Sequence, residues 1–315
     1  MNNLVVSNRV SISRNFADLP FPNKMNEEQR DTNLARVSRA LYGGREIFRQ
    51  ITKEDNECLN DLGLDSSMLD SALENGDAVI FENSTCDTYV VAGDLDGIKI
   101  IRYFDDVQDE PLKELYNISD LLFKDFPAAY DKDFGFLTAK PMQAGSGAEI
   151  SVLVHLPVSN SLRQIPATIK RVQEEHKCDL LPLENDKNDS CLYVLSCKAE
   201  QDKKMPDNLK EALMVVADQE KMLAKKVLSN PRSSLYDQAY RAYGILKYAR
   251  RITGSEFLYL WSLLRMGAEN EILPIDIETV DALLSLNNKE YNQFPVNAGD
   301  INFLRADEIR RRLEE

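Results

Sequence analysis

A loop of small residues, Gly145-Ser146-Gly147, directly precedes an apolar segment and is the first feature of the chain that could do chemistry. The backbone N–H groups of such a loop, placed beside a sheet, can point at a phosphate and bind it. Glu149 follows the second glycine by two residues, however, and its carboxylate would repel an anion. Two interpretations stay open. The glycines form only a tight turn into a strand, or the loop is the remnant of a phosphate site with inverted charge.

Other residues of catalytic type are few and scattered. Asp94 and Asp96 could act as a paired acid and base, but their position beside Gly97 is typical of a polar hairpin turn. Lys140 could be a nucleophile if it were buried, and is otherwise a solvated lysine. The five cysteines never form a Cys-x-x-Cys motif, and two histidines cannot build a metal site alone. We therefore expect neither a metal site nor a disulfide framework.

Composition excludes several classes of protein. With 43% hydrophobic and 29% charged residues, the chain is typical of a globular domain in water. A formal net charge of −14 argues against nucleic acid, which needs a basic face. The basic run at 310–312 is flanked by acidic residues, so we expect a solvated helix face there. Neither an apolar run of about 18 residues nor a signal-peptide core is present, which favours a cytoplasmic protein without membrane contact.

The residues named above must be positioned by a sheet with helices on a face. Asn26 and Gln29 form a capping-box pattern for a helix that Gly43-Gly44 can end. Asp96-Gly97 indicates a hairpin. Strand-like segments lie at 78–81, 88–92, 98–104, 150–158 and 191–197, and helical patterns at about 110–125 and 160–176. We expect an α+β fold with a largely antiparallel sheet flanked by helices.

From about residue 207 the apolar period changes to 3.6 and indicates a long helix, then several short ones. We place a boundary near Pro231, which gives a first domain at 1–230 and a C-terminal helical domain at 231–315. Tyr240, Tyr243 and Trp261 are spaced as helix core residues rather than as a ligand cage. The apolar string "FLYLWSLLRM" is expected to bury against another subunit or protein, or else to close the domain's own core.

Four strings together resemble the phosphagen (guanidino) kinases, and in particular the bacterial protein arginine kinases. They are "VSNRVSISRNFADLPFP", "DFGFLTAKP", "GSGAEISVLVHLP" and "YRAYGILKYARRI", in the family's order from about residue 4 to the C-terminus. The resemblance implies an antiparallel catalytic domain, followed by helices used for dimerisation and phosphoarginine binding. It also implies transfer of the γ-phosphoryl of Mg-ATP to a guanidinium, with arginines aligning the phosphates and a carboxylate orienting the nucleophile.

Residue by residue, the family's motifs are incomplete in this chain. In the Ser-x-Arg-x-Arg motif the first arginine is Arg9 and the second is replaced by Ser11. The guanidinium-orienting carboxylate falls on Leu95, and the phosphate arginine after it becomes Lys99. The family's reactive cysteine falls on Lys140. The resemblance therefore predicts no functional catalytic residue.

Two more of the family's phosphate arginines become acidic here, as Glu149 and Asp179. A hydrogen bond to a charged group contributes about 1.5–3 kcal/mol, so three or four lost ones remove roughly 5–10 kcal/mol. Millimolar to micromolar binding amounts to only about 4–8 kcal/mol. The resemblance thus implies a degenerate ATP site. Arg9 would be a structural ion-pair partner, with Glu149 as one possible carboxylate, or a surviving nucleotide ligand.

The C-terminal phosphoarginine motif of the family, Arg-Asp-x-x-Arg-Ala, falls on residues 301–306. Arg305 and Ala306 match it, whereas the first arginine and the aspartate are missing. One arginine holds a phosphate only weakly, so we favour a structural role for Arg305.

The leading hypothesis is a catalytically inactive protein-arginine-kinase-like protein, a pseudokinase, that is a regulatory or scaffolding partner of another protein. The partner would be an active homologue or a component of the stress-response proteolysis machinery that the family serves. This hypothesis predicts no cofactor and no metal, and a homodimer or a hetero-complex. Two alternatives stay open: a divergent active kinase that uses Arg9, Lys99 and Lys140 with Mg-ATP, and a phosphoarginine-binding reader.

Overall fold

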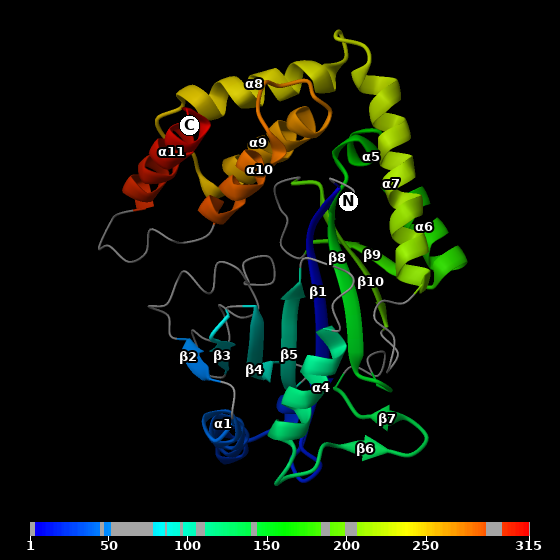
Figure 1. Ribbon diagram of the computed structural model, residues 1–315, viewed down its shortest axis with the longest axis vertical. Helices are drawn as coiled ribbons and strands as arrows, with labels where there is room; N and C mark the ends of the chain where they lie inside the picture. The colour runs from blue at the N-terminus through cyan, green and yellow to red at the C-terminus, as the bar shows by residue number, and fades with distance from the viewer. Residues whose placement is uncertain are drawn as a thin grey trace.

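The fold is α+β, with one large antiparallel sheet and helices, as the sequence predicts (Figure 1). The computed structural model describes residues 4–44, 47–51, 78–85, 87–94, 97–104, 111–139, 144–183, 190–198, 207–287 and 298–314. Within these ranges the large sheet has eight strands, in the order β2 (Phe48–Ile51), β3 (Val79–Asn83), β4 (Thr88–Asp94), β5 (Gly97–Phe104), β1 (Val5–Arg14), β8 (Ala148–His155), β10 (Leu192–Lys198) and β9 (Asp179–Pro182). A small hairpin joins β6 (Tyr130–Asp131) to β7 (Gly135–Phe136).

One face of the sheet is covered by helices that come from both halves of the first domain. They are α1 (Glu27–Tyr42), α4 (Pro111–Leu122), α6 (Ile165–His176) and the long α7 (Asp207–Leu228). The predicted capping box begins α1, because Asn26 accepts from the Gln29 N–H at 2.9 Å and donates its own N–H to the Gln29 side chain at 3.0 Å. The predicted β4–β5 hairpin is also present. Gly97 there has a backbone φ of +111°, which residues with a side chain rarely adopt.

Three strands of the large sheet are absent from the sequence prediction, and one predicted strand is too long. The central strand β1 and the short strands β2 and β9 are not predicted. The strand expected to reach residue 158 ends at His155, because Pro157 begins the short helix α5 (Pro157–Ser161). Proline cannot donate to a ladder but fits the first turn of a helix.

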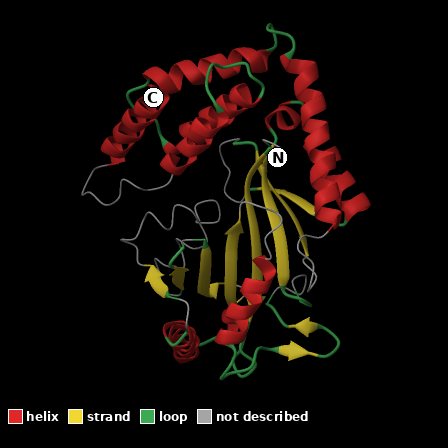
Figure 2. Cartoon of the chain, in the orientation of Figure 1, coloured by secondary structure: helices red, strands yellow, loops and turns green. Residues whose placement is uncertain are grey.

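The C-terminal helices gather beyond the end of the sheet where β1 begins (Figures 1 and 2). They are α8 (Ser234–Tyr248), α9 (Gly254–Glu269), α10 (Ile277–Ala282) and α11 (Ala298–Glu314), and a short 3₁₀ turn at Leu283–Asn287 follows α10. Another 3₁₀ turn, Pro22–Lys24, precedes α1. Their hydrophobic core also includes Leu153 and Leu192 of the sheet and Leu228 of α7. The helices therefore pack on the first domain through a shared core.

The string "FLYLWSLLRM" closes this core. Trp261 is fully buried and donates its Nε1–H to the Val280 carbonyl at 2.8 Å. Of the two outcomes that the sequence left open, the domain's own core is the correct one for Trp261 and the other buried residues of the string, whereas Tyr259 stays 41% exposed. Tyr240, in contrast, is not a core residue, because it stays about half exposed. The expectation of a solvated basic run is also wrong for Arg310, which is buried and donates to the Ala249 carbonyl.

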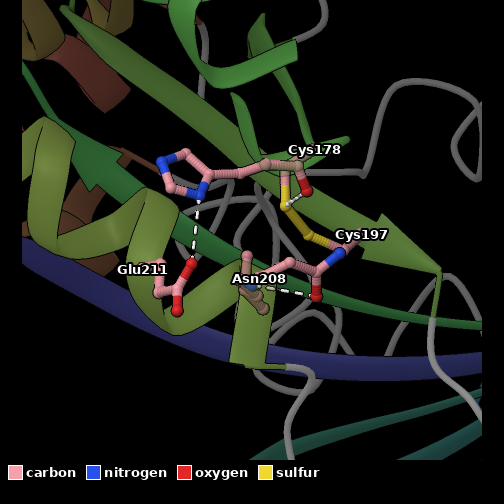
Figure 3. Close-up of a disulfide and its surroundings, with 6 residues drawn as sticks. Cys178, Cys197, Asn208 and Glu211 are labelled. Carbon is pink, nitrogen blue, oxygen red and sulfur yellow. Dashed lines mark hydrogen bonds and ion pairs between the residues drawn. A yellow bond between two sulfur atoms is a disulfide. The ribbon is translucent and has the colours of Figure 1, made fainter. Parts of the chain in front are cut away.

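One expectation about the cysteines is wrong, because Cys178 and Cys197 form a disulfide (Figure 3). Both are buried: Cys178 immediately precedes β9, and Cys197 lies near the end of β10. The antiparallel pairing of the two strands brings them opposite each other, with Cα atoms 4.8 Å apart. A spacing of 19 residues gives no sign of this pairing, which depends on the antiparallel register. No helix in the described part of the chain combines the length and apolar character that crossing a membrane requires.

Candidate functional site

The register of the sheet brings the predicted site residues onto one face. In β1, Val10 and Ile12 belong to the main core, so Arg9 and Ser11 point to the opposite face. Residues that face each other across antiparallel strands share a face. Following the register outward from β1 therefore places six polar residues together, which we call the polar band: Arg9, Ser11, Lys99, Glu149, Ser151 and Asp179.

Neighbours within the polar band are set by strand pairing. Glu149 lies directly opposite Ser11, whereas Arg9 lies opposite Ser151 and donates from Nε to the Ser151 hydroxyl at 3.2 Å. Asp179 lies two strands farther out, on the edge strand β9. The hollow beside Arg9 has a volume of about 20 Å³, which is room for about one water molecule. A larger hollow of about 160 Å³ is lined instead by residues around α1 and Gly93.

The glycine loop uses its backbone groups internally. The Gly145 N–H donates to the Phe136 carbonyl at 3.2 Å, and the Ala148 N–H donates to the Ser146 hydroxyl at 3.2 Å. A Cβ on Gly147 would lie 2.4 Å from the guanidinium of Arg14, and φ there is +62°. The geometry supports the first of the two interpretations, because glycine is needed here for a tight turn into β8.

Arg14 is the residue of this region that the sequence analysis missed. It is buried, donates to the carbonyls of Ser13 and Ser146 at 2.9 Å each, and lies 3.6 Å from the ring centre of Phe136. Burial is the main cause that lowers the pKa of Arg14 to about 10, so it stays charged at neutral pH. Alternate residues of a strand point to the same face, so Arg14 lies on the core side with Val10 and Ile12. This alternation is the signal in the sequence that could have revealed its burial.

Several predicted positions cannot be placed. Leu95 and Lys140, on which the family's catalytic positions fall, lie outside the described residues, as does Asp96. Asp94 ends β4, but its side chain is likewise outside the description. Within the described residues, no three His, Cys, Asp or Glu side chains are close enough together to hold a metal ion.

The C-terminal positions lie in α11 and face the protein. Ala306 is fully buried, and Arg305 donates to the backbone carbonyls of Leu286 at 3.0 Å and Ile252 at 2.9 Å. It also donates to the Asn302 side chain at 3.1 Å. These contacts join α11 to the segments before α9 and after α10, which is a structural use of the guanidinium.

A buried polar junction connects the sheet to α9. His155, at the end of β8, lies 2.7 Å from the Ser262 hydroxyl, within the reach of a serine nucleophile and its base. Both residues are buried, and Arg265 lies 3.5 Å from the other ring nitrogen, where a catalytic triad would have a carboxylate. Burial first, and then Arg265, lower the pKa of His155 well below its usual value. The pair is therefore a packing junction that holds a neutral imidazole.

Comparison with known proteins identifies the family. The family model described as ATP:guanido phosphotransferase, C-terminal catalytic domain, matches residues 27–227, well over half of the chain. The chain belongs to this family. A second model, the protein-arginine kinase McsB C-terminal domain, matches residues 232–315. The resemblance to guanidino kinases seen in the sequence is thus confirmed at the level of the family.

Similar curated proteins are protein-arginine kinases. That of Caldanaerobacter subterraneus is 26% identical, covering 89% of this chain and 87% of the relative. That of Clostridium botulinum is 26% identical, covering 99% and 96% respectively. The C. kluyveri protein-arginine kinase is 27% identical over 98% of this chain and 94% of its own.

Two solved structures share the fold. A lombricine kinase has a TM-score of 0.57 at 16% identity, over 75% of this chain and 70% of that chain. The duplicated taurocyamine kinase of Schistosoma mansoni, with bound transition state analogue components, has a TM-score of 0.56 at 22% identity. The match covers 77% of this chain but only 37% of the duplicated protein. At these identities the likeness concerns the fold alone.

Proposed function

We propose that this chain is a catalytically inactive member of the guanidino kinase family that works by binding another protein. The observation that carries this proposal is the charge of the polar band. Glu149 and Asp179 occupy positions where the resemblance expects phosphate-binding arginines, and a serine replaces a third. A carboxylate close to a phosphate costs up to about 4 kcal/mol at an effective dielectric near 20, so the band is poorly suited to a triphosphate.

Two features of the geometry support the same proposal. The glycine loop donates the N–H groups of Gly145 and Ala148 to its own neighbours, which makes them unavailable to an anion. The hollow beside Arg9 is also about the size of one water molecule.

The test is a direct assay of nucleotide binding and of arginine phosphorylation. Titration calorimetry with Mg-ATP should show no heat of binding, and a protein substrate rich in arginine should gain no acid-labile phosphate. The protein-arginine kinase of C. kluyveri is the positive control under identical conditions. Phosphoarginine formed by this chain would overturn the proposal.

A second candidate function is a divergent active protein arginine kinase. It is favoured by the match to protein-arginine kinases along nearly the whole chain, and by the two cations that the polar band keeps, Arg9 and Lys99. In that case Mg-ATP would bind, and Lys99→Ala together with Lys140→Ala would abolish phosphoryl transfer. The same assay therefore separates the two candidates.

The partner would be a protein: an active homologue, a component of a proteolysis machinery, or a second copy of this chain. Light scattering on the eluting full chain measures whether it is a homodimer at micromolar concentration. A monomer would leave a hetero-complex as the form in which it acts.

A further inference from the structure

The segment around α8 differs in charge from the rest of the chain. Residues 231–253 contain one carboxylate, Asp237, and five cations, a difference of +4 in a chain whose formal charge is −14. The cations are Arg232, Arg241, Lys247, Arg250 and Arg251, and all except Lys247 are exposed. Arg241 pairs with Asp237 on the helix surface at 3.8 Å, and the excess of cations along this segment of an acidic protein is a steering field for an acidic partner.

The same helix exposes large apolar side chains on its outer side. Tyr248 is 73% exposed, Tyr240 46% and Ile245 41%, while its inner side is buried in the C-terminal core. Tyr240 is held in place, because its hydroxyl donates to the Ile272 carbonyl at 3.0 Å. Residues four apart lie on one face of a helix, so Tyr240 and Tyr248 flank the position between them, Gly244.

Gly244 has no reason within the chain to be glycine. A Cβ there would meet nothing within 4 Å, and its φ is not positive. Gly267 in α9 is different, because a Cβ would lie 2.5 Å from Leu273. Glycine inside a helix costs about 1 kcal/mol relative to alanine. The notch at Gly244 between two exposed tyrosines is therefore a place where something outside the chain can approach closely.

We propose that the outer side of α8, which we call the α8 face (Tyr240, Arg241, Gly244, Ile245 and Tyr248), docks an acidic helix of a partner protein. The inference rests on the proposed function and names the surface and the chemistry of its partner. The partner helix crosses α8 at Gly244, where the absent side chain lets the two backbones come close. The tyrosine rings cover its apolar side, and Arg241 with the other cations of residues 231–253 meets its carboxylates.

A second copy of this chain fits the α8 face poorly. A two-fold contact centred on Gly244 would place each basic segment against its own copy, and like charges across an interface repel. The partner is therefore a different protein, and self-association through this face is an outcome that contradicts the proposal.

The probe is a displayed library of helical peptides with one randomised face, selected on the full-length chain and counter-selected on its Gly244→Leu variant. We expect the enriched peptides to be rich in glutamate and aspartate around a small or apolar residue. Anisotropy of the best peptide should then show binding about tenfold or more weaker to Gly244→Leu and to Arg241→Glu, and weaker binding as salt rises. Lys225→Leu on the exposed side of α7 is the matched control and should bind normally.

We expect Gly244→Leu to fold, because leucine is a better helix former than glycine and a Cβ at this position would meet nothing within 4 Å. Enrichment of neutral or basic peptides, no enrichment, or equal affinity of Gly244→Leu would overturn the proposal. So would a single-stranded RNA that competes for the face, or a homodimer that Gly244→Leu dissolves. Phosphorylation of arginine by the chain would instead contradict the proposed function, while peptide binding at α8 is measured independently.

Discussion

Among single residues, Glu149 gives the most direct test of the polar band. Its cross-strand neighbours are Ser11 on β1 and Lys198 on β10, so an arginine there would face a serine and a lysine. We predict that Glu149→Arg alone restores neither Mg-ATP binding nor phosphoryl transfer, because Ser11 and Asp179 are unchanged. Titration calorimetry measures the binding, with Glu149→Gln as the control for loss of the carboxylate. Heat of binding in the arginine variant alone would show that the band is nearer to a working site than we propose.

His155 makes the folding stability depend on pH. Its folded pKa is held well below 6.5 by burial, so below about pH 6.5 the unfolded chain binds a proton that the folded chain does not. Stability from this residue is present above that pH and falls by roughly 1.4 kcal/mol per pH unit below it. Urea unfolding from pH 7.5 to 5.5 should therefore show a steeper loss in the native sequence than in His155→Gln.

The difference between the native chain and His155→Gln isolates the contribution of His155 to the pH dependence of stability. Burial raises the pKa of Glu220 and of Glu269, which contribute in the opposite direction. Their contribution is present at low pH and is lost as pH rises through the folded pKa. Parallel pH curves for His155→Gln and the native chain would mean that the imidazole is already protonated in the folded protein.

At the scale of elements, the disulfide fastens the edge strand β9 to β10. A sequence separation of 19 residues between its cysteines predicts about 3 kcal/mol of stability from the restricted unfolded chain. We expect a thiol reductant to lower the urea midpoint of the native chain. Cys197→Ser should have the lower midpoint with or without reductant. Cys191→Ser is the control, since Cys191 is not part of this bond, and it should keep the sensitivity to reductant. Cys178 and Cys197 found as thiols in the oxidised native protein would contradict the structure.

The turn into β8 depends on a glycine that touches its neighbours. Gly147→Ala forces a side chain against Arg14 and against the Ser13 carbonyl, at a φ of +62°, and should destabilise the fold by about 1–3 kcal/mol. Gly244→Ala is the matched control at an open helical position and should be neutral or stabilise by up to about 1 kcal/mol. Equal melting temperatures for the two variants would show that the loop relaxes without cost.

At the scale of the whole molecule, the C-terminal helices share a core with the sheet. Cutting the chain after residue 230 would expose Leu153 and Leu192 and remove Ser262 from His155. Each fully buried aliphatic side chain contributes about 1.5–3 kcal/mol, so we predict that the piece 1–230 unfolds at a lower urea concentration than the full chain or aggregates. Leu153→Asn in the piece separates two causes, the exposed apolar surface and the lost contacts. It removes apolar surface without restoring any contact, so it should reduce aggregation but leave the urea midpoint low. A soluble piece as stable as the full chain would mean that the two parts fold independently.

The features that the sequence determined by itself depend on neighbouring residues. The capping box at Asn26 and Gln29, the hairpin at Gly97 and the long helix from 207 are local patterns, and all three are present. The family was also readable, because its motifs are short strings in a fixed order. β1 is different: Arg9 and Ser11 alternate with the buried Val10 and Ile12 as in a half-buried strand, but the motif that these polar residues resemble does not itself indicate a strand.

Only the tertiary structure decided which distant residues meet. Arg14 reaches the Ser146 carbonyl across 132 positions, and Cys178 meets Cys197 through the register of two strands. Likewise, Trp261 is core while Tyr240 of the neighbouring helix is exposed, although both have helical spacing. Periodicity fixes which residues share a face, but the packing of one element on another decides which face is covered, and that depends on contacts between parts of the chain that sequence spacing does not relate.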